Sequence, residues 1–335
     1  MKMKNNVLPL LLLMTLSSAF AQKKFKTPPY LKVGDTIAIV APAGILKNKE
    51  ETIQKAKELA ESWGLKVVLG NNLFNQNNHF SGTDEERSQD FQEALDNKNI
   101  KAIWVARGGY GSVRILDKLN FIKFKNKPKW IIGYSDITAF HNHIHTLKIE
   151  TIHGMMATNL SENPEDIIET VASLKKAIFG EQIRYTIPSS TFNRVGVSSK
   201  SLKIIEGKII GGNISILSSM LGSKSQINTE GKILFIEEIG EYKYAVDRML
   251  QSLKRAGYFT KVKAVIVGDM SNIKVNSTEW GSSIEELILG VLPKEIPVLF
   301  NFPAGHELDN RAMIFGRKVE LIIGNTNSSL VFKEI

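Results

Sequence analysis

Residues 130–141 of the chain read WIIGYSDITAFH, a short apolar run that passes through a Gly-x-Ser corner into a helical pattern. A strand, a tight turn and a helix in this order are typical of α/β proteins. Ser135 stands on the corner, where a hydroxyl is exposed beside N–H groups that the first helical turn leaves unpaired. A nucleophile needs that environment. The same residues also fit a simpler interpretation, in which Ser135 or Asp136 only caps the following helix.

The residues before this corner predict a parallel sheet. Apolar runs of strand length alternate with helical patterns through short connections: strands at 35–40, 66–70 and 100–106, and helices at 49–64 and 83–97. This alternation indicates an α/β domain. The third strand leads into Arg107, Gly108 and Gly109, and ligands of open α/β sheets gather beyond the carboxyl ends of strands. These glycines can offer bare backbone amides to a ligand, or serve only the turn before the next helix.

The length and composition predict two domains. The chain has over 300 residues after its basic and apolar start at 1–21. This is more than a single hydrophobic core usually organises. We predict an N-terminal α/β domain at 28–160, a linker region at 161–201 and a second domain at 202–335. The linker region is loose and rich in serine, although residues 164–180 keep a helical pattern.

Residues 1–21 have the pattern of a signal peptide. Lys2 and Lys4 precede an apolar run at 7–16, and Ala19 and Ala21 supply small residues for cleavage after Ala21. The apolar run is too short to span a bilayer. We therefore expect a cleaved leader and an exported, periplasmic protein with no stable membrane insertion. A retained N-terminal anchor is the alternative.

The charge of the chain is basic without being concentrated. The formal net charge is +9, and it falls to +7 once Lys2 and Lys4 leave with the leader. The lysines are scattered and no nucleic-acid motif accompanies them, so we expect no nucleic-acid partner. Attraction to anionic polymers of the cell envelope stays open. The chain has no cysteine, which excludes disulfides.

Two later segments offer partners for a serine nucleophile. The apolar run at 231–236 ends in Glu237 and Glu238, and a carboxylate at a buried strand end is costly unless it is paired. His306 follows the strand-like run at 296–302 on a loop, where catalytic groups are often placed. The order serine, acid, histidine is that of α/β-hydrolases. Both residues also fit ordinary solvated positions.

A cluster of histidines suggests a different chemistry. His141 and His145 are four residues apart on the helix after Ser135 and could face one metal ion. Position 142 is asparagine, however, so the glutamate of a zinc-peptidase helix is missing. We therefore predict no metal site and expect structural histidines. A zinc hydrolase is retained as a rival hypothesis that predicts inhibition by a chelator.

Several motifs together resemble the LD-carboxypeptidase family of serine peptidases. They follow one another in the family's order across nearly the whole mature chain: ARGGYG at 106–111, GYSD at 133–136, HGM at 153–155, GGN at 211–213, FIEEIGE at 235–241, DRML at 247–250 and GH at 305–306. Two positions depart from the family's habit. Met155 stands where proline often follows the HG pair, and Glu307 stands where glycine is common after the histidine.

The resemblance implies a fold, an activity and an assembly. Family members have an N-terminal parallel-sheet domain like that of class I glutamine amidotransferases, and a C-terminal α/β domain of the swivelling type. They are commonly homodimers. For this chain we expect no metal or organic cofactor. Typical members remove the terminal D-alanine from murein tetrapeptides, and one branch hydrolyses toxins of the microcin C type.

The resemblance also places roles on residues of this chain. It implies a catalytic triad of Ser135, Glu237 and His306. Glu238 is a rival for the acid role, but alternation along a strand points it to the opposite face. The N–H groups of Asp136 and Gly109 would face the oxyanion.

Four further residues within the family motifs are candidates for substrate binding, and they come from two segments: Arg107 and Gly108, and Gly212 and Asn213. We therefore predict an exported serine LD-carboxypeptidase whose site lies between two domains. A non-catalytic exported protein that binds a peptide or a sugar is the alternative from another class, and it would leave its ligand intact.

Overall fold

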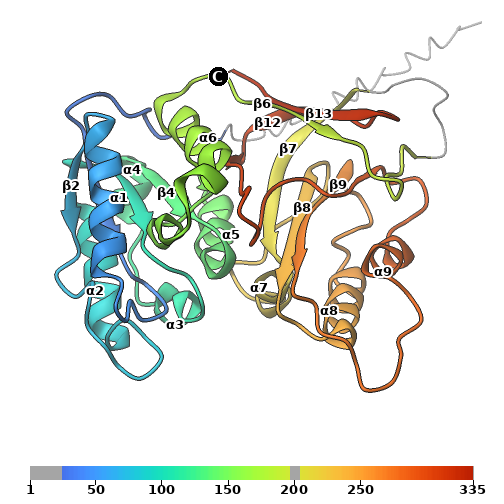
Figure 1. The fold of residues 1–335 in the computed structure, drawn as a ribbon, viewed down its shortest axis with the longest axis horizontal. Helices are drawn as coiled ribbons and strands as arrows, with labels where there is room; N and C mark the ends of the chain where they lie inside the picture. Colours follow the sequence, from blue (N-terminus) through green and yellow to red (C-terminus); the bar gives the residue numbers. More distant parts are fainter. Residues whose placement is uncertain (1–24, 197–203, 335) are drawn as a thin grey trace, which may run out of the picture.

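The computed structural model describes residues 25–196 and 204–334, which form two α/β domains side by side (Figure 1). The predicted leader at 1–21 and the serines at 198–201 lie outside these residues. The predicted fold class is confirmed: each domain has its own sheet at its centre, mainly parallel in the first domain and half parallel, half antiparallel in the second.

The first sheet has six strands in the order β11-β5-β4-β3-β1-β2. Five of them are parallel and come from the N-terminal part of the chain: β1 (Thr36–Val40), β2 (Lys66–Leu69), β3 (Ile100–Val105), β4 (Trp130–Gly133) and β5 (Thr151–His153). The predicted strands therefore lie where the apolar runs indicated, and β4 ends directly before the serine corner.

Helices cover both faces of this sheet. One face packs against α1 (Glu50–Ser62) and α6 (Ile168–Phe179), and the other packs against α2 (Asp84–Asp96), α3 (Ser112–Leu116) and α5 (Thr138–Thr146). Further short helices are α4 (Ile122–Asn126), η2 (Ala157–Ser161) and η3 (Pro164–Ile167). The local sequence explains the boundaries well at α2, where Thr83 and Glu86 form a capping box.

The second sheet has seven strands in the order β10-β9-β8-β7-β12-β13-β6. Its parallel half consists of β7 (Ile204–Asn213), β8 (Ile233–Ile239), β9 (Ala264–Ser271) and β10 (Val298–Leu299), and its antiparallel half consists of β12 (Lys318–Ile322), β13 (Asn327–Phe332) and β6 (Arg184–Pro188). One face packs against α7 (Ile214–Ser219), α8 (Lys243–Arg255) and α9 (Ile284–Val291).

Two strands cross the predicted division of the chain. β6 lies in the segment that we assigned to the linker, yet it pairs with β13 at the edge of the second sheet. β11 (Met313–Phe315) lies in the predicted second domain, yet it pairs antiparallel with β5 in the first sheet. Both pairings join segments far apart in sequence, which apolar patterns alone do not encode.

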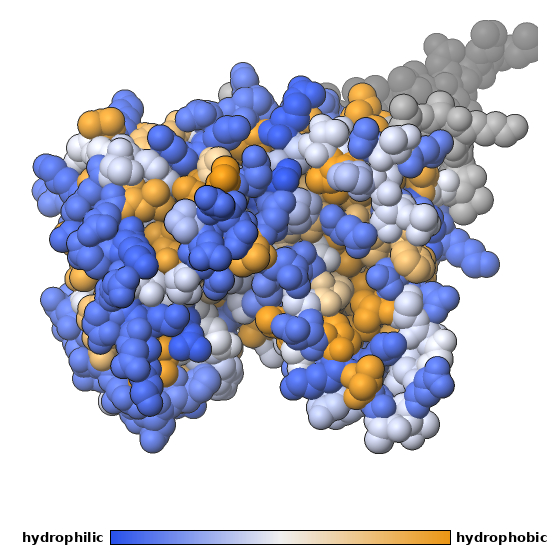
Figure 2. Space-filling model, in the orientation of Figure 1, coloured by the Kyte–Doolittle hydropathy of each residue, from blue (hydrophilic) through white to orange (hydrophobic). Residues whose placement is uncertain are grey.

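The two domains share a continuous apolar core. Side chains from both sheets, among them Trp104, Phe235 and Phe315, belong to one buried cluster. The visible surface is mostly polar and is hollowed between the two domains at its lower edge (Figure 2). Within residues 25–196 and 204–334, no helix has the length and hydropathy needed to cross a membrane.

Candidate active site

The serine corner has the geometry of a nucleophile turn. After β4, Ser135 adopts a φ of +60°, which is strained for a residue with a side chain. A 3-10 helix, η1 (Ser135–Ile137), and then α5 follow at once. Gly133 is required by the tightness of the turn, since a β-carbon there would lie 2.8 Å from the Ile137 side chain. The turn therefore pushes the Ser135 hydroxyl outward, as in the elbow of α/β-hydrolases.

Three predicted residues meet in one hydrogen-bonded chain. The Ser135 hydroxyl lies 2.9 Å from His306 Nε2, and His306 Nδ1 lies 2.7 Å from Glu237 Oε2. A carboxylate can only accept here, so Nδ1–H donates to Glu237 and Nε2 is free to accept the serine proton. Glu237 is fully buried and the His306 side chain is 12% exposed. The serine comes from the first domain and the acid from the second.

The loop that carries His306 connects the two sheets. It leaves β10 in the second sheet and ends in β11 in the first sheet. Asp269, at the end of β9, anchors it by accepting the Glu307 N–H at 3.0 Å. Gly305 has a φ of +142°, and a β-carbon on it would lie 2.8 Å from the Asp269 side chain. The loop is thus closely fitted around this carboxylate.

Nearby carboxylates hold the pKa of His306 above its ordinary value of 6.5. Burial is the largest single influence and acts in the opposite direction, but the Glu237 hydrogen bond and the charges of Glu237, Glu238 and Asp269 outweigh it. For the carboxyl group of Asp269, burial has the opposite effect and raises the pKa to about 6. A raised histidine pKa suits a group that must hold a proton for part of a reaction.

The two adjacent glutamates have different partners. The pairing of β8 with β9 shifts register between Ile236 and Glu238, a bulge of the kind that re-aims side chains beside active sites. Glu238 accepts hydrogen bonds from the Asn213 side chain at 3.0 Å and from the Ser215 N–H at 2.8 Å. Glu238 therefore fixes the start of α7, and only Glu237 contacts the histidine.

The predicted oxyanion donors lie next to one another. A β-carbon built on Gly108 would lie 3.6 Å from the Asp136 nitrogen, so the glycine turn abuts the serine corner. The Asp136 carboxylate ties the two together, because it accepts the Ser112 N–H at 2.9 Å. Among the described residues, no backbone hydrogen bond outside the helices and strands occupies the Gly109 N–H, and Asp136 is the second residue of η1, where a first helical turn leaves N–H groups unpaired. Both remain available to a developing negative charge.

The other predicted binding residues divide into two kinds. Arg107 is exposed beside the glycine turn and donates a hydrogen bond to the Ile45 carbonyl at 2.5 Å. Asn213 is buried and joins the domains, since its N–H donates to the Thr138 hydroxyl at 3.0 Å. Gly212 has a φ of +134°, and a β-carbon on it would collide with that hydroxyl. Gly212 and Asn213 thus hold the domain junction.

The histidines after the corner are buried in the first domain. Burial lowers the pKa of His141 to about 4, so its ring is neutral and Nε2–H donates to the Gly133 carbonyl at 2.8 Å. The His145 ring packs against the Phe25 ring, with the ring centroids 4.7 Å apart. In the part of the chain that the structure describes, no three histidine or acidic side chains are grouped to hold a metal ion.

Sequence reasoning missed three residues of the site. Asp269 directly follows the apolar strand at 262–268, and the strand-end signal that identified Glu237 could have found it. Thr138 and Tyr134 gave no such signal. The Tyr134 ring packs edge-on against the His306 ring, with centroids 5.1 Å apart, and this contact arises only when the domains meet.

Models of one protein family match both domains. Residues 37–154 match the LD-carboxypeptidase N-terminal domain, and residues 206–321 match the LD-carboxypeptidase C-terminal domain. Together these segments cover most of the chain, including the serine corner, β8 and the His306 loop.

Individual relatives are similar over nearly their whole length. A probable murein peptide carboxypeptidase of Bacillus subtilis is 34% identical, over 88% of this chain and 91% of its own. The microcin C7 self-immunity protein MccF of Escherichia coli is 30% identical, over 90% of this chain and 94% of its own.

A solved structure extends this similarity to the fold. The muramoyltetrapeptide carboxypeptidase from Oxalobacter formigenes superposes with a TM-score of 0.78 at 26% identity, covering 89% of this chain and 99% of its own. The family models, the relatives and the superposition agree over both domains. The chain belongs to the LD-carboxypeptidase family.

Proposed function

We propose that this protein is a serine LD-carboxypeptidase that removes the terminal D-alanine from murein tetrapeptides. The hydrogen-bonded chain from Ser135 through His306 to Glu237 carries the proposal, because it aligns a nucleophile, a base and an acid from three separate segments. A protein that only binds a peptide has no use for this alignment. The names of the relatives from Bacillus subtilis and Oxalobacter formigenes support the choice of substrate.

The first half of the reaction forms an acyl-enzyme. Ser135 Oγ attacks the carbonyl carbon of the bond to D-alanine while His306 Nε2 takes the hydroxyl proton. Glu237 keeps the imidazole in the required tautomer and stabilises its charged form. The N–H groups of Asp136 and Gly109 receive the oxyanion. His306 then gives its proton to the departing amine, and D-alanine leaves.

The second half restores the enzyme. A water molecule takes the place of the amine and gives its proton to His306 Nε2 as it attacks the ester carbon. The same two N–H groups stabilise the second oxyanion, and loss of one such donor typically costs about 10²–10³ in rate. Collapse returns the proton to Ser135 and releases the shortened peptide.

Mass spectrometry on defined murein tetrapeptides tests the proposal. The purified protein should release D-alanine, Ser135→Ala should release none, and the control Ser161→Ala should act as the unaltered protein does. Ser161 is an exposed serine outside the site. Release by Ser135→Ala at the normal rate would overturn the triad. Loss of activity with a chelator would favour the zinc hypothesis, and an intact bound peptide would favour a binding protein.

A microcin-directed hydrolase is the second candidate function. The 30% identity to the Escherichia coli self-immunity protein favours it, because that relative covers both domains. The two functions share the triad and differ in the substrate. Parallel assays with a murein tetrapeptide and a peptidyl-nucleotide toxin of the microcin C type decide between them through the ratio of kcat/KM values.

We further propose that the protein is exported and loses its leader. The basic start, the apolar run and the small residues before Gln22 support cleavage after Ala21. The mass of the protein isolated from the periplasmic fraction should correspond to a chain that begins at Gln22. A full-length chain in the cytoplasmic fraction would contradict this.

A further inference from the structure

Four lysines form a row across four neighbouring strands of the second sheet. Lys318 on β12 is paired with Lys208 on β7. Lys232 and Lys263 come directly before β8 and β9, and the registers of Ile209 with Ile233 and of Ile233 with Ala264 extend the row to them. The Lys263 N–H donates to the Lys232 carbonyl at 2.8 Å. Residues in one row of a sheet share a face, and like charges directly opposite one another destabilise the pairing. The ammonium groups of these lysines therefore repel one another, at the edge of the sheet that is remote from Ser135.

The row lines a pocket at the junction of the domains. The pocket has a volume of about 580 Å³ and also contains Lys148, which follows α5 in the first domain, and Phe25. Lys148, Lys208 and Lys232 are half-buried here, and we call them the lysine triplet. A cavity of this size is typical of sites for small molecules.

The positive charge of the pocket is not balanced by its acidic residues. Two glutamates line it, and each is already paired with a lysine outside the triplet: Glu206 with Lys318 at 2.6 Å, and Glu230 with Lys261 at 3.0 Å. Within residues 25–196 and 204–334, no member of the triplet forms an ion pair with a carboxylate, although the Lys232 ammonium donates a hydrogen bond to the Asn228 carbonyl.

Burial and the charges of neighbouring lysines act together on two ammonium groups of the triplet, those of Lys208 and Lys232. Burial, followed by repulsion from Lys148 and Lys208, lowers the pKa of Lys232 to about 8. Burial and the charge of Lys148 lower the pKa of Lys208 in the same way. The Lys208 ammonium lies 4.3 Å from the centre of the Phe25 ring, which holds it over the pocket. An anion bound among them would relieve both costs.

We propose that the lysine triplet binds a phosphate-type oxyanion. Its members bring several N–H donors to one pocket, which suits a compact group with several acceptor oxygens and more than one negative charge. A single carboxylate would balance only one of the three ammonium groups. Since Lys148 belongs to the first domain and Lys208 and Lys232 to the second, the bound anion bridges the domains.

This site is separate from the serine site. Lys208 precedes Asn213 by five positions on β7, a separation of about 17 Å along an extended strand. Asn213 stands at the end of the strand that contacts the serine domain through Thr138. The anion pocket therefore occupies the opposite edge of the same sheet, and removal of its lysines leaves the triad intact.

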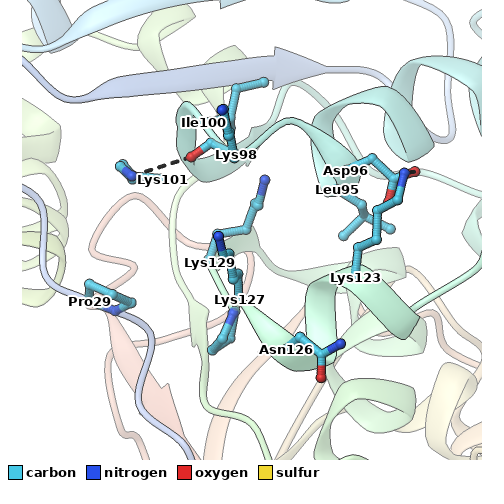
Figure 3. A pocket seen from close by; sticks show the side chains of 11 residues that line it. Pro29, Leu95, Asp96, Lys98, Ile100, Lys101, Lys123, Asn126, Lys127 and Lys129 are labelled. Atoms are coloured by element: carbon cyan, nitrogen blue, oxygen red, sulfur yellow. Dashed lines mark hydrogen bonds and ion pairs between the residues drawn. The ribbon is translucent and has the colours of Figure 1, made fainter.

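A second lysine-rich pocket serves as the matched comparison. It has a volume of about 630 Å³ and is also lined by five lysines (Figure 3). Its two central lysines already have partners: Lys123 pairs with Asp96 at 3.1 Å, and Lys129 donates to the carbonyls of Ala94 and Asn97. Lys98 and Lys127 are exposed at its rim. We expect no selective anion binding in this pocket.

Titration calorimetry with inorganic pyrophosphate and phosphate tests the proposal on three proteins. The unaltered protein should bind pyrophosphate at one site, and K208M/K232M should bind it about tenfold or more weakly. The control K98M/K127M, which removes the same charge from the other pocket, should bind as the unaltered protein does. Equal weakening in both variants would overturn the proposal, because it would reveal only general attraction to positive charge.

Thermal unfolding is a second test, and it distinguishes loss of the anion site from a folding defect in the variant. Without an anion, K208M/K232M should unfold at the same temperature as the unaltered protein or higher, because the repulsion is gone. Pyrophosphate should raise the midpoint of the unaltered protein and not that of the variant. A variant that unfolds earlier and still responds to pyrophosphate would contradict the proposal.

Vesicles distinguish the two sources of a phosphate group. The protein is sedimented with vesicles of phosphatidylcholine, alone or with phosphatidic acid added. Binding of pyrophosphate in solution supports a soluble ligand. Binding only to vesicles with phosphatidic acid, lost in K208M/K232M, supports a lipid headgroup. Failure of all three probes, phosphate, pyrophosphate and vesicles, would overturn the proposal.

Discussion

The serine corner and the His306 loop reach the same site by different means. The corner is built from consecutive residues: β4 ends, Ser135 takes a φ of +60°, and η1 begins within the same few positions. The loop has no regular structure and depends on distant partners, with Glu237 and Asp269 bonding to it from two other strands. One half of the site is local in sequence and the other is assembled by the fold.

Because of this difference, substitutions in the two regions should have different effects. Changes near Ser135 act on a turn whose conformation is set by its own neighbours, so their effects stay close to the nucleophile. Changes at β8, at β9 or at the domain junction move the base without touching it. The two regions should therefore respond differently to substitution.

Removal of either end of the triad should abolish activity to the same extent. Ser135→Ala and His306→Ala should each lower kcat by about 10⁶-fold, and the double variant should lose no more, because the residues act as a unit. Steady-state release of D-alanine measures all three. Additive losses in the double variant would show that the corner and the loop work independently.

The two neighbouring glutamates should respond differently to the same change. Glu237→Gln should lower kcat by about 10⁴-fold, because the amide no longer fixes the required histidine tautomer. Glu238→Gln should chiefly lower the free energy of unfolding, by about 1–3 kcal/mol, since buried donors at Asn213 and Ser215 lose an acceptor. Kinetics together with urea unfolding test both. The reverse pattern would exchange the roles of the two residues.

A methyl group added at Gly212, in the domain junction, should destabilise the protein more than a methyl group added at an open glycine such as Gly222. Gly212→Ala should cost about 2–4 kcal/mol, because the new β-carbon meets the Thr138 hydroxyl and φ is +134°. The control Gly222→Ala has a φ of +77° and open space around it, so it should cost only about 1 kcal/mol. Equal midpoints in urea would argue against a tight junction.

The pH dependence of activity should reflect the pKa of His306 and the effect of Asp269 on it. The base works when neutral, so kcat/KM should fall as the pH drops through the raised pKa of His306, placing the acidic limb above pH 6.5. Asp269→Asn removes a charge that raises this pKa and keeps an acceptor for the Glu307 N–H, so the limb should move to lower pH. An unmoved limb would mean that Asp269 only anchors the loop.

The sequence predicted the local half of the site better than the assembled half. The strand at 130–132 and the turn at Ser135 are consecutive, so periodicity and turn residues were enough to find them. Glu237 and His306 were candidates from a strand end and a loop, and the family motifs assigned their roles, because no local pattern shows that they meet. They meet because β9 joins the strand of Glu237 to β10, from which the His306 loop leaves, and this strand order is not visible in local patterns.

Strand register was the other feature beyond sequence reasoning. The lysines looked scattered along the chain, and the predicted surface was evenly solvated. Lys208, Lys232 and Lys318 come together only because three strands are aligned in one register. A shift by one residue would turn each side chain to the opposite face. Charge counts therefore missed a concentration of charge that the sheet creates.

The place of β11 also sets an order of events during folding. Residues 313–315 complete the first sheet, so β5 keeps an open edge until this segment has been synthesised or translocated. The same event pulls His306 toward Ser135, because the loop ends in this strand. A chain cut short before residue 313 would therefore leave the edge of β5 open, and its His306 loop would have no attachment to the first sheet.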